Sequence, residues 1–166
     1  KVPQDYTVFE PKGETAGAYL KLKENFLFPI STYQKLEKDP LSAVRVLEKV
    51  LALGIDAKLI MLGTGSWASA LRRQSKGLPV EFPGWQEPIP YLQRADVVLC
   101  TSRYESWGAS IVEALVAGVP VVAPDVGIAK EAGAIVVERA DLAATVADTI
   151  RSGRRGELRL SLLGRE

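Results

Sequence analysis

The chain has 166 residues, of which 47% are hydrophobic and 25% are charged, as in ordinary globular proteins rather than disordered, collagen-like or coiled-coil ones. A chain of this length forms one domain that buries about two-thirds of its unfolded surface without a disulfide or metal staple. Lysine and arginine total 21 and aspartate and glutamate 20, so the net charge of +1 gives no electrostatic case for nucleic acid as the main partner.

The single cysteine, Cys100, and the absence of histidine narrow the chemistry further. One thiol forms no internal disulfide, so a reducing, cytoplasmic compartment fits best. Without histidine, Ser-His-Asp and Cys-His catalysis are excluded, and we expect no metal site. The longest apolar run, residues 114–124, is shorter than the roughly 20 residues that span a bilayer.

Apolar runs of strand length alternate with segments of helical spacing along most of the chain. Residues 1–25 are polar, with several prolines and glycines, and are predicted to be a linker or arm with one short strand near 6–9. Strands are predicted over 26–30, 57–62, 80–82, 97–100, 119–123 and 134–137. Helices are predicted over 40–53, with Asp39 as cap, and over 67–74, 88–94, 108–117, 128–132, 141–151 and 157–163.

The predicted strands are continuously apolar and do not alternate with polar residues. This pattern is typical of a parallel sheet covered by helices on both faces. We therefore expect an α/β fold with a doubly wound, Rossmann-like sheet. Ligands bind such sheets outside the carboxyl ends of the strands, where the strand order reverses.

Two glycine-containing turns follow predicted strands. The turn at 63–66 could be part of a dinucleotide site, but it follows the second strand and lacks the later acidic residue, so a tight turn is the default interpretation. The turn before Gly108 opens a helix whose first amides are free to bind an anion such as a diphosphate. Glu105 lies just before that helix. Glu113 lies within it among apolar residues, so it either faces solvent or meets a ligand hydroxyl.

The spacing of Glu105 and Glu113 alone carries no weight, because about one such pair is expected by chance. The surrounding sequence carries it: an aromatic-Gly step between the pair, and the strand 119–123 after it. Further matching stretches are KLIMLGTG at 58–65, VEFPGW at 80–85, ADVVL at 95–99 and AGVPVVA at 117–123. Together these stretches, within about residues 26–163, resemble the C-terminal domain of retaining nucleotide-sugar glycosyltransferases of group 1, the Glu-x7-Glu family with the two-domain GT-B fold.

The resemblance implies a nucleotide-sugar donor, a UDP- or GDP-sugar, bound without a metal. The backbone amides expected at its diphosphate are those of Trp107, Gly108, Ala109 and Ser110. Glu113 would accept hydrogen bonds from the ribose hydroxyls, because an ionised carboxylate suits a vicinal diol. The loop with Gly84 and Trp85 would lie against the base.

The resemblance also implies the catalytic residues. Glu105 would hold hydroxyls of the transferred sugar. The family has a Gly-Arg after the first strand and a lysine shortly beyond, which together neutralise the leaving diphosphate. Here the arginine is absent from 29–38, and Lys35 is the preferred candidate for the lysine, with Lys38 as the alternative. We expect weaker stabilisation of the leaving group as a result.

The family pattern places an acceptor-binding domain before this chain. Residues 1–25 are then a linker from that missing domain and 26–166 the nucleotide-sugar-binding domain, which alone should bind a donor without transferring the sugar. The full-length enzyme would transfer a hexose to a sugar or lipid acceptor, with possible peripheral contact at the inner membrane face. Two alternatives stay open: a nucleotide-sugar epimerase of the same fold, and a degenerate, non-catalytic module that binds a nucleotide or a partner.

Overall fold

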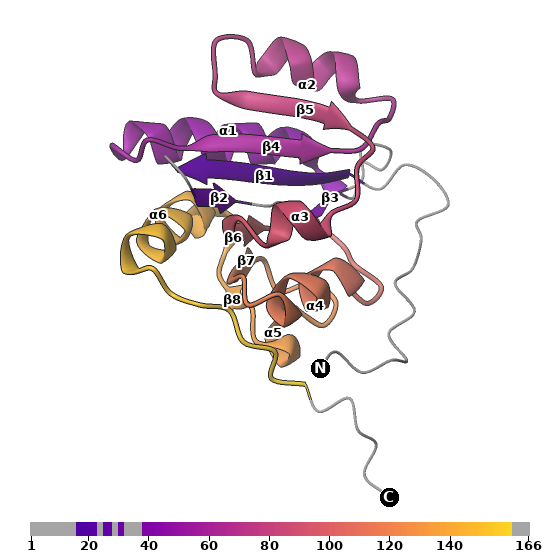
Figure 1. Cartoon of the computed structure of the whole chain (residues 1–166), viewed down its shortest axis with the longest axis vertical. Helices are drawn as coiled ribbons and strands as arrows, with labels where there is room; N and C mark the ends of the chain where they lie inside the picture. The colour runs from indigo at the N-terminus through magenta and orange to yellow at the C-terminus, as the bar shows by residue number, and fades with distance from the viewer. Residues whose placement is uncertain (1–15, 23–24, 28–29, 32–37, 161–166) are drawn as a thin grey trace, which may run out of the picture.

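The predicted doubly wound α/β fold is confirmed by a computed structural model, which describes residues 16–22, 25–27, 30–31 and 38–160. The parallel strands are β2 (Asn25–Leu27), β4 (Lys58–Leu62), β5 (Val80–Gly84), β6 (Ala95–Leu99), β7 (Val121–Ala123) and β8 (Ile135–Val136). Their pairings give the order β5-β4-β2-β6-β7-β8. In Figure 1 a further strand, β1 (Ala16–Leu22), is drawn between β4 and β2, with both of which it also pairs. The predicted strand near 6–9 lies outside the described residues.

Alternate residues of the central strands enter two separate cores, one on each face of the sheet. On β4, Leu59 and Met61 belong to one core and Ile60 and Leu62 to the other, and β6 alternates in the same way. Successive side chains of a strand point to opposite faces, so a strand covered on both sides must be apolar throughout. This explains why the sequence shows continuous apolar runs.

Helices cover both faces. The first core is completed by α1 (Pro40–Ala52), α2 (Ala68–Gln74) and α6 (Leu142–Ser152). The second is completed by α3 (Ile89–Leu92), α4 (Ala109–Val116) and α5 (Ala129–Ala132). A short 3-10 turn, η2 (Arg139–Asp141), leads into α6. None of these helices, within the part of the chain that is described, has the length and apolar character to cross a membrane.

The sheet differs from the prediction in one respect, because it also contains antiparallel strands. Strand β1 (Ala16–Leu22) runs antiparallel to β4, with Leu20 opposite Leu59, and also pairs with β2 and β3 (Ile30–Ser31). The predicted linker over 1–25 is therefore wrong for residues 16–22, which belong to the sheet. The glycines and prolines before residue 18 suggested a break, whereas tertiary pairing decides the conformation of a strand more than its local propensity does.

A second difference lies near the C-terminus, where a helix was predicted over 157–163. Residues 157–160 are not helical, and 161–163 lie outside the described range. The Gly156 N–H donates to the Gly118 carbonyl at 3.0 Å and the Arg159 N–H to the Ala132 carbonyl at 2.9 Å. A Cβ on Gly156 would lie 2.1 Å from the Val119 carbonyl oxygen, so backbone crosses backbone there. Hydrogen bonds to neighbouring loops replace those a helix would have made.

The order of the parallel strands reverses between β2 and β6. Strands β4 and β5 follow β2 outward on one side, while β7 and β8 follow β6 on the other. The segments leaving the carboxyl ends of β2 and β6 therefore turn to opposite faces and open a crevice between them. Lys38 and Asp39, just before α1, lie on one of these segments, and residues 100–108 form the other.

Candidate active site

An ion pair joins the two segments at this crevice. Lys38 Nζ contacts Glu105 Oε1, and the Ser102 hydroxyl donates to the same oxygen at 2.7 Å. The Lys38 side chain is 18% exposed and that of Glu105 is 8% exposed, so the pair is largely withdrawn from solvent. Both donors use Oε1, and no described residue donates to Oε2. The carboxylate is thus held in one orientation with an oxygen available to a ligand.

Arg139 forms hydrogen bonds to both of these segments. Its guanidinium donates to the carbonyls of Thr101 (2.8 Å) and Ser102 (3.2 Å), and to Asp39 Oδ2 at 2.6 Å. The Thr101 hydroxyl adds a bond to the Lys38 carbonyl at 3.1 Å. These contacts fix the backbone on either side of the Lys38–Glu105 pair. Sequence reasoning missed Arg139, which lies far along the chain in a turn with no recognisable motif.

Asp39 does not have the capping role that the sequence predicted. Helix α1 begins at Pro40 as expected, but the Asp39 side chain makes no cap hydrogen bond. Its φ of +45° is in the left-handed region, uncommon for a residue other than glycine. The carboxylate instead accepts bonds from Arg139 and, at 3.1 Å, from Arg103 Nε. Two guanidinium groups attract it more strongly than a backbone amide does.

The N-terminus of α4 presents free amides, as the sequence predicted. Gly108 precedes the helix with φ +100°, and no side chain caps it. No described residue accepts a hydrogen bond from the backbone N–H of Trp107, Gly108, Ala109 or Ser110. The first N–H with a partner is that of Ile111, which bonds the Gly108 carbonyl at 3.0 Å. Free amides and the helix dipole together make this helix end attractive to an anion.

The loop after β7 supports the residues before α4. The Ile128 N–H donates to the Trp107 carbonyl at 2.8 Å. A Cβ on Gly127 would lie 2.4 Å from that carbonyl oxygen and 2.9 Å from Glu105 Cβ, so only glycine fits against them. The Trp107 side chain is 44% exposed. The loop therefore fixes the Trp107 backbone and leaves the indole open to solvent or a ligand.

Glu113 lies on α4 and is half-buried, not turned out into bulk water. Burial, and secondarily the negative charge of Glu87, raise the pKa of its carboxyl above the ordinary value. A half-buried carboxylate with a raised pKa is unfavourable unless a partner donates to it. Since perturbed carboxyls gather at functional sites, Glu113 remains a candidate for binding ligand hydroxyls.

The loop after β5 holds the other predicted binding residues. Gly84 ends β5 with φ +80°, its carbonyl accepts the Gly63 N–H at 2.6 Å, and the Trp85 side chain is 55% exposed. In the sheet, β5 is separated from β6 by β4 and β2. Glu87 acts on the charge of Glu113, however, so this loop comes near α4.

Of the two candidate lysines, Lys38 contacts Glu105, and Lys35, the preferred one, lies outside the described residues. Burial raises the pKa of the Cys100 thiol, which disfavours a nucleophilic thiolate. Within the described ranges, no cluster of three or more aspartate, glutamate or cysteine side chains is placed to hold a metal ion.

A sequence model of the glycosyl transferases group 1 family matches residues 25–152. The chain belongs to this family. The chain is 31% identical over 91 residues to the GDP-mannose-dependent alpha-(1-6)-phosphatidylinositol dimannoside mannosyltransferase of Mycobacterium tuberculosis, a match covering 52% of the chain and 24% of that enzyme. It is 30% identical over 109 residues to N-acetyl-alpha-D-glucosaminyl L-malate synthase of Bacillus anthracis, covering 63% of the chain and 28% of that enzyme.

Solved structures support the fold. The chain superposes on a variant of TarM of S. aureus, crystallised with UDP, with a TM-score of 0.69 and 21% identity over 79% of this chain and 29% of TarM. The fold is thus that of one domain of the GT-B glycosyltransferases. The matched segments span about a quarter of the length of the relatives named above.

Proposed function

We propose that this chain is the donor-binding domain of a retaining glycosyltransferase, in which a nucleoside diphosphate sugar lies in the crevice between β2 and β6. The observation that carries the proposal is the Lys38–Glu105 pair, in which Glu105 lies three residues before Gly108, at the end of α4 that has free amides. A cation, free N–H groups and carboxylates are the groups that a diphosphate joined to two sugars requires.

Each group has a place on the donor. The amides of residues 107–110 bind the diphosphate, and Glu113 accepts hydrogen bonds from the ribose hydroxyls. Lys38 and Glu105 neutralise each other in the structure. When the donor enters, Lys38 turns to the diphosphate and Glu105 accepts hydrogen bonds from the hexose hydroxyls, so the ligand replaces an existing ion pair and leaves no buried charge unpaired.

The chemical step separates charge. The bond between the anomeric carbon and the diphosphate oxygen breaks, and negative charge develops on the leaving diphosphate. The acceptor hydroxyl oxygen bonds to the same face of that carbon, and its proton passes to the departing diphosphate oxygen. Lys38 and the α4 amides stabilise this charge, and such fixed donors are usually the largest catalytic contribution. The acceptor and the remainder of the cleft belong to the rest of the enzyme. The activities of the relatives, a mannosyltransferase and an N-acetyl-glucosaminyl malate synthase, support a hexose donor.

Calorimetric titration with UDP, GDP and ADP tests the proposal. We expect one diphosphate to bind, and Glu113→Gln to weaken that binding about tenfold, the effect of losing roughly one charge-assisted hydrogen bond. Glu48→Gln is the matched control, because Glu48 is exposed on α1 and should leave the affinity unchanged. If no diphosphate binds, the chain is a non-catalytic module. Sugar transfer by the full-length protein then separates a transferase from an epimerase.

A further inference from the structure

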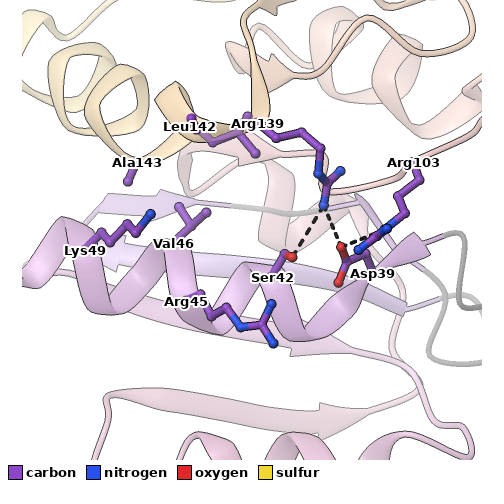
Figure 2. Close-up of a pocket in the computed structure, with 10 residues that line it drawn as sticks. Asp39, Ser42, Arg45, Val46, Lys49, Arg103, Arg139, Leu142 and Ala143 are labelled. Atoms are coloured by element: carbon purple, nitrogen blue, oxygen red, sulfur yellow. Dashed lines mark hydrogen bonds and ion pairs between the residues drawn. The ribbon is translucent and has the colours of Figure 1, made fainter.

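A cavity of about 300 Å³ lies between α1 and the start of α6 (Figure 2). It is on the face of the sheet opposite α4, because α1 and α6 belong to the first core and α4 to the second. In Figure 2, Lys49 and Val46 of α1 lie across from Ala143 and Leu142 of α6. The α4 amides proposed for the donor lie on the other face, although Asp39, Arg103 and Arg139 of the cavity lining also belong to or contact the segments at the crevice.

The lining of the cavity is strongly cationic. The lining holds four cations, Arg45, Lys49, Arg103 and Arg139, and a single carboxylate, that of Asp39. Arg139 and Arg103 both donate to Asp39 Oδ2, so that one negative charge is already shared between two guanidinium groups. The excess of positive charge has no counterpart in the lining.

Two of these cations are without an acidic partner. Arg45 and Lys49 are exposed, four residues apart on α1, and no described residue forms an ion pair with either. Like charges at this helical spacing repel, and an anion held between them removes the repulsion. Leu142 and Ala143, the first residues of the 11-residue helix α6, also line the cavity, so the positive end of its dipole opens on it.

We propose that this cavity binds a phosphate-bearing group, either a soluble phosphate ester or the headgroup of a phospholipid. A phosphate carries more negative charge than a carboxylate and has several oxygens to bond separate cations. The volume is at the lower end for small-molecule sites, which suits a phosphate with one small substituent. Arg45, Lys49 and the α6 N-terminus hold it, while Arg139 stays bonded to Asp39.

The first test is a nuclear magnetic resonance titration of the isotope-labelled chain with inorganic phosphate at constant ionic strength. We expect saturable shifts of the amides of residues 45, 49, 142 and 143. The double variant Arg45→Gln/Lys49→Gln should weaken this binding about tenfold or more, the loss of at least one charge-assisted hydrogen bond. The control Arg73→Gln/Lys76→Gln removes the same charge from exposed positions outside the cavity and should bind as the original chain does.

Absence of a saturable shift, or an equal loss in the control variant, overturns the proposal. Sedimentation with phosphatidylcholine vesicles, with and without phosphatidic acid, then distinguishes the two sources. Binding that requires phosphatidic acid and is lost in Arg45→Gln/Lys49→Gln assigns a headgroup, whereas phosphate shifts without sedimentation assign a soluble ester. Titration with UDP reports the amides of residues 107–110 separately, so failure here and failure of the donor site are distinguishable.

Discussion

Replacing Arg139 by methionine should destabilise the fold markedly, because it breaks the link between the segments at the crevice. The change removes bonds to Asp39 Oδ2 (2.6 Å) and to the carbonyls of Thr101 and Ser102 (2.8 and 3.2 Å), while methionine keeps much of the side-chain length. Thr101 and Ser102 are fully buried, and Asp39 is 12% exposed, so water replaces these bonds poorly. After allowance for the 35% exposure of Arg139 itself, we expect a loss of about 2–4 kcal/mol in the free energy of unfolding.

Urea denaturation measures this loss, and in a thermal scan it corresponds to a fall in Tm of roughly 5–15 °C for a domain of this size. Arg103→Met is the matched control. Arg103 donates to the same carboxylate but is 67% exposed, so its removal should cost less than about 1 kcal/mol. Equal losses in the two variants would refute the reasoning, because burial and the carbonyl bonds of Arg139 would then contribute nothing.

Three further predictions concern the site. Lys38→Met leaves the Glu105 carboxylate withdrawn from water without its cation, which should lower the free energy of unfolding by about 3–5 kcal/mol. The double variant Lys38→Met/Glu105→Gln should recover part of this loss in urea denaturation, and a double variant no more stable than the single one contradicts the reasoning. Gly127→Ala should lower the free energy of unfolding several times more than Gly77→Ala, for which we expect a loss of roughly 1 kcal/mol. Both glycines have a positive φ, but only a Cβ on Gly127 would meet a backbone oxygen. Equal unfolding midpoints of the two variants would count against the tight contact. Because the pKa of Glu113 is raised in the folded state, the protein loses stability as the pH rises above the ordinary value of 4.5 and through the raised pKa. Glu113→Gln should therefore raise Tm at neutral pH and leave it unchanged below pH 4.5. A Tm gain that does not depend on pH would rule out this cause.

The sequence predicted the parts of the fold that depend on local pattern. Continuous apolar runs predicted the strands and their burial on both faces, and the strand-Gly-helix pattern at Gly108 predicted free amides that the structure confirms. Strand β1 could not be found in the same way, because its place depends on pairing with β4, which lies about 40 residues further along the chain.

The interactions at the candidate site were harder to predict than its backbone. That Lys38 contacts Glu105, and that Arg139 bonds Asp39, depends on which loops the strand order brings to one edge of the sheet. No spacing in the sequence encodes contacts between residues 67 and 100 positions apart. The roles of Glu105, Glu113, Trp107, Gly84 and Trp85 toward a donor stay predictions until a nucleotide is bound.

Because β4 and β6 send alternate side chains into separate cores, the two faces of this domain can change independently. A substitution at Leu59 alters the packing beneath α1 and α6, whereas one at Ile60 alters the packing on the α4 side. The helices beside the cationic cavity and the helix that carries the donor amides thus rest on different core side chains, while Arg139 links the two regions through its bonds to Asp39, Thr101 and Ser102. Natural variation can therefore retune one surface while the other keeps its shape, and an engineer can do the same by choosing odd or even positions along a single strand.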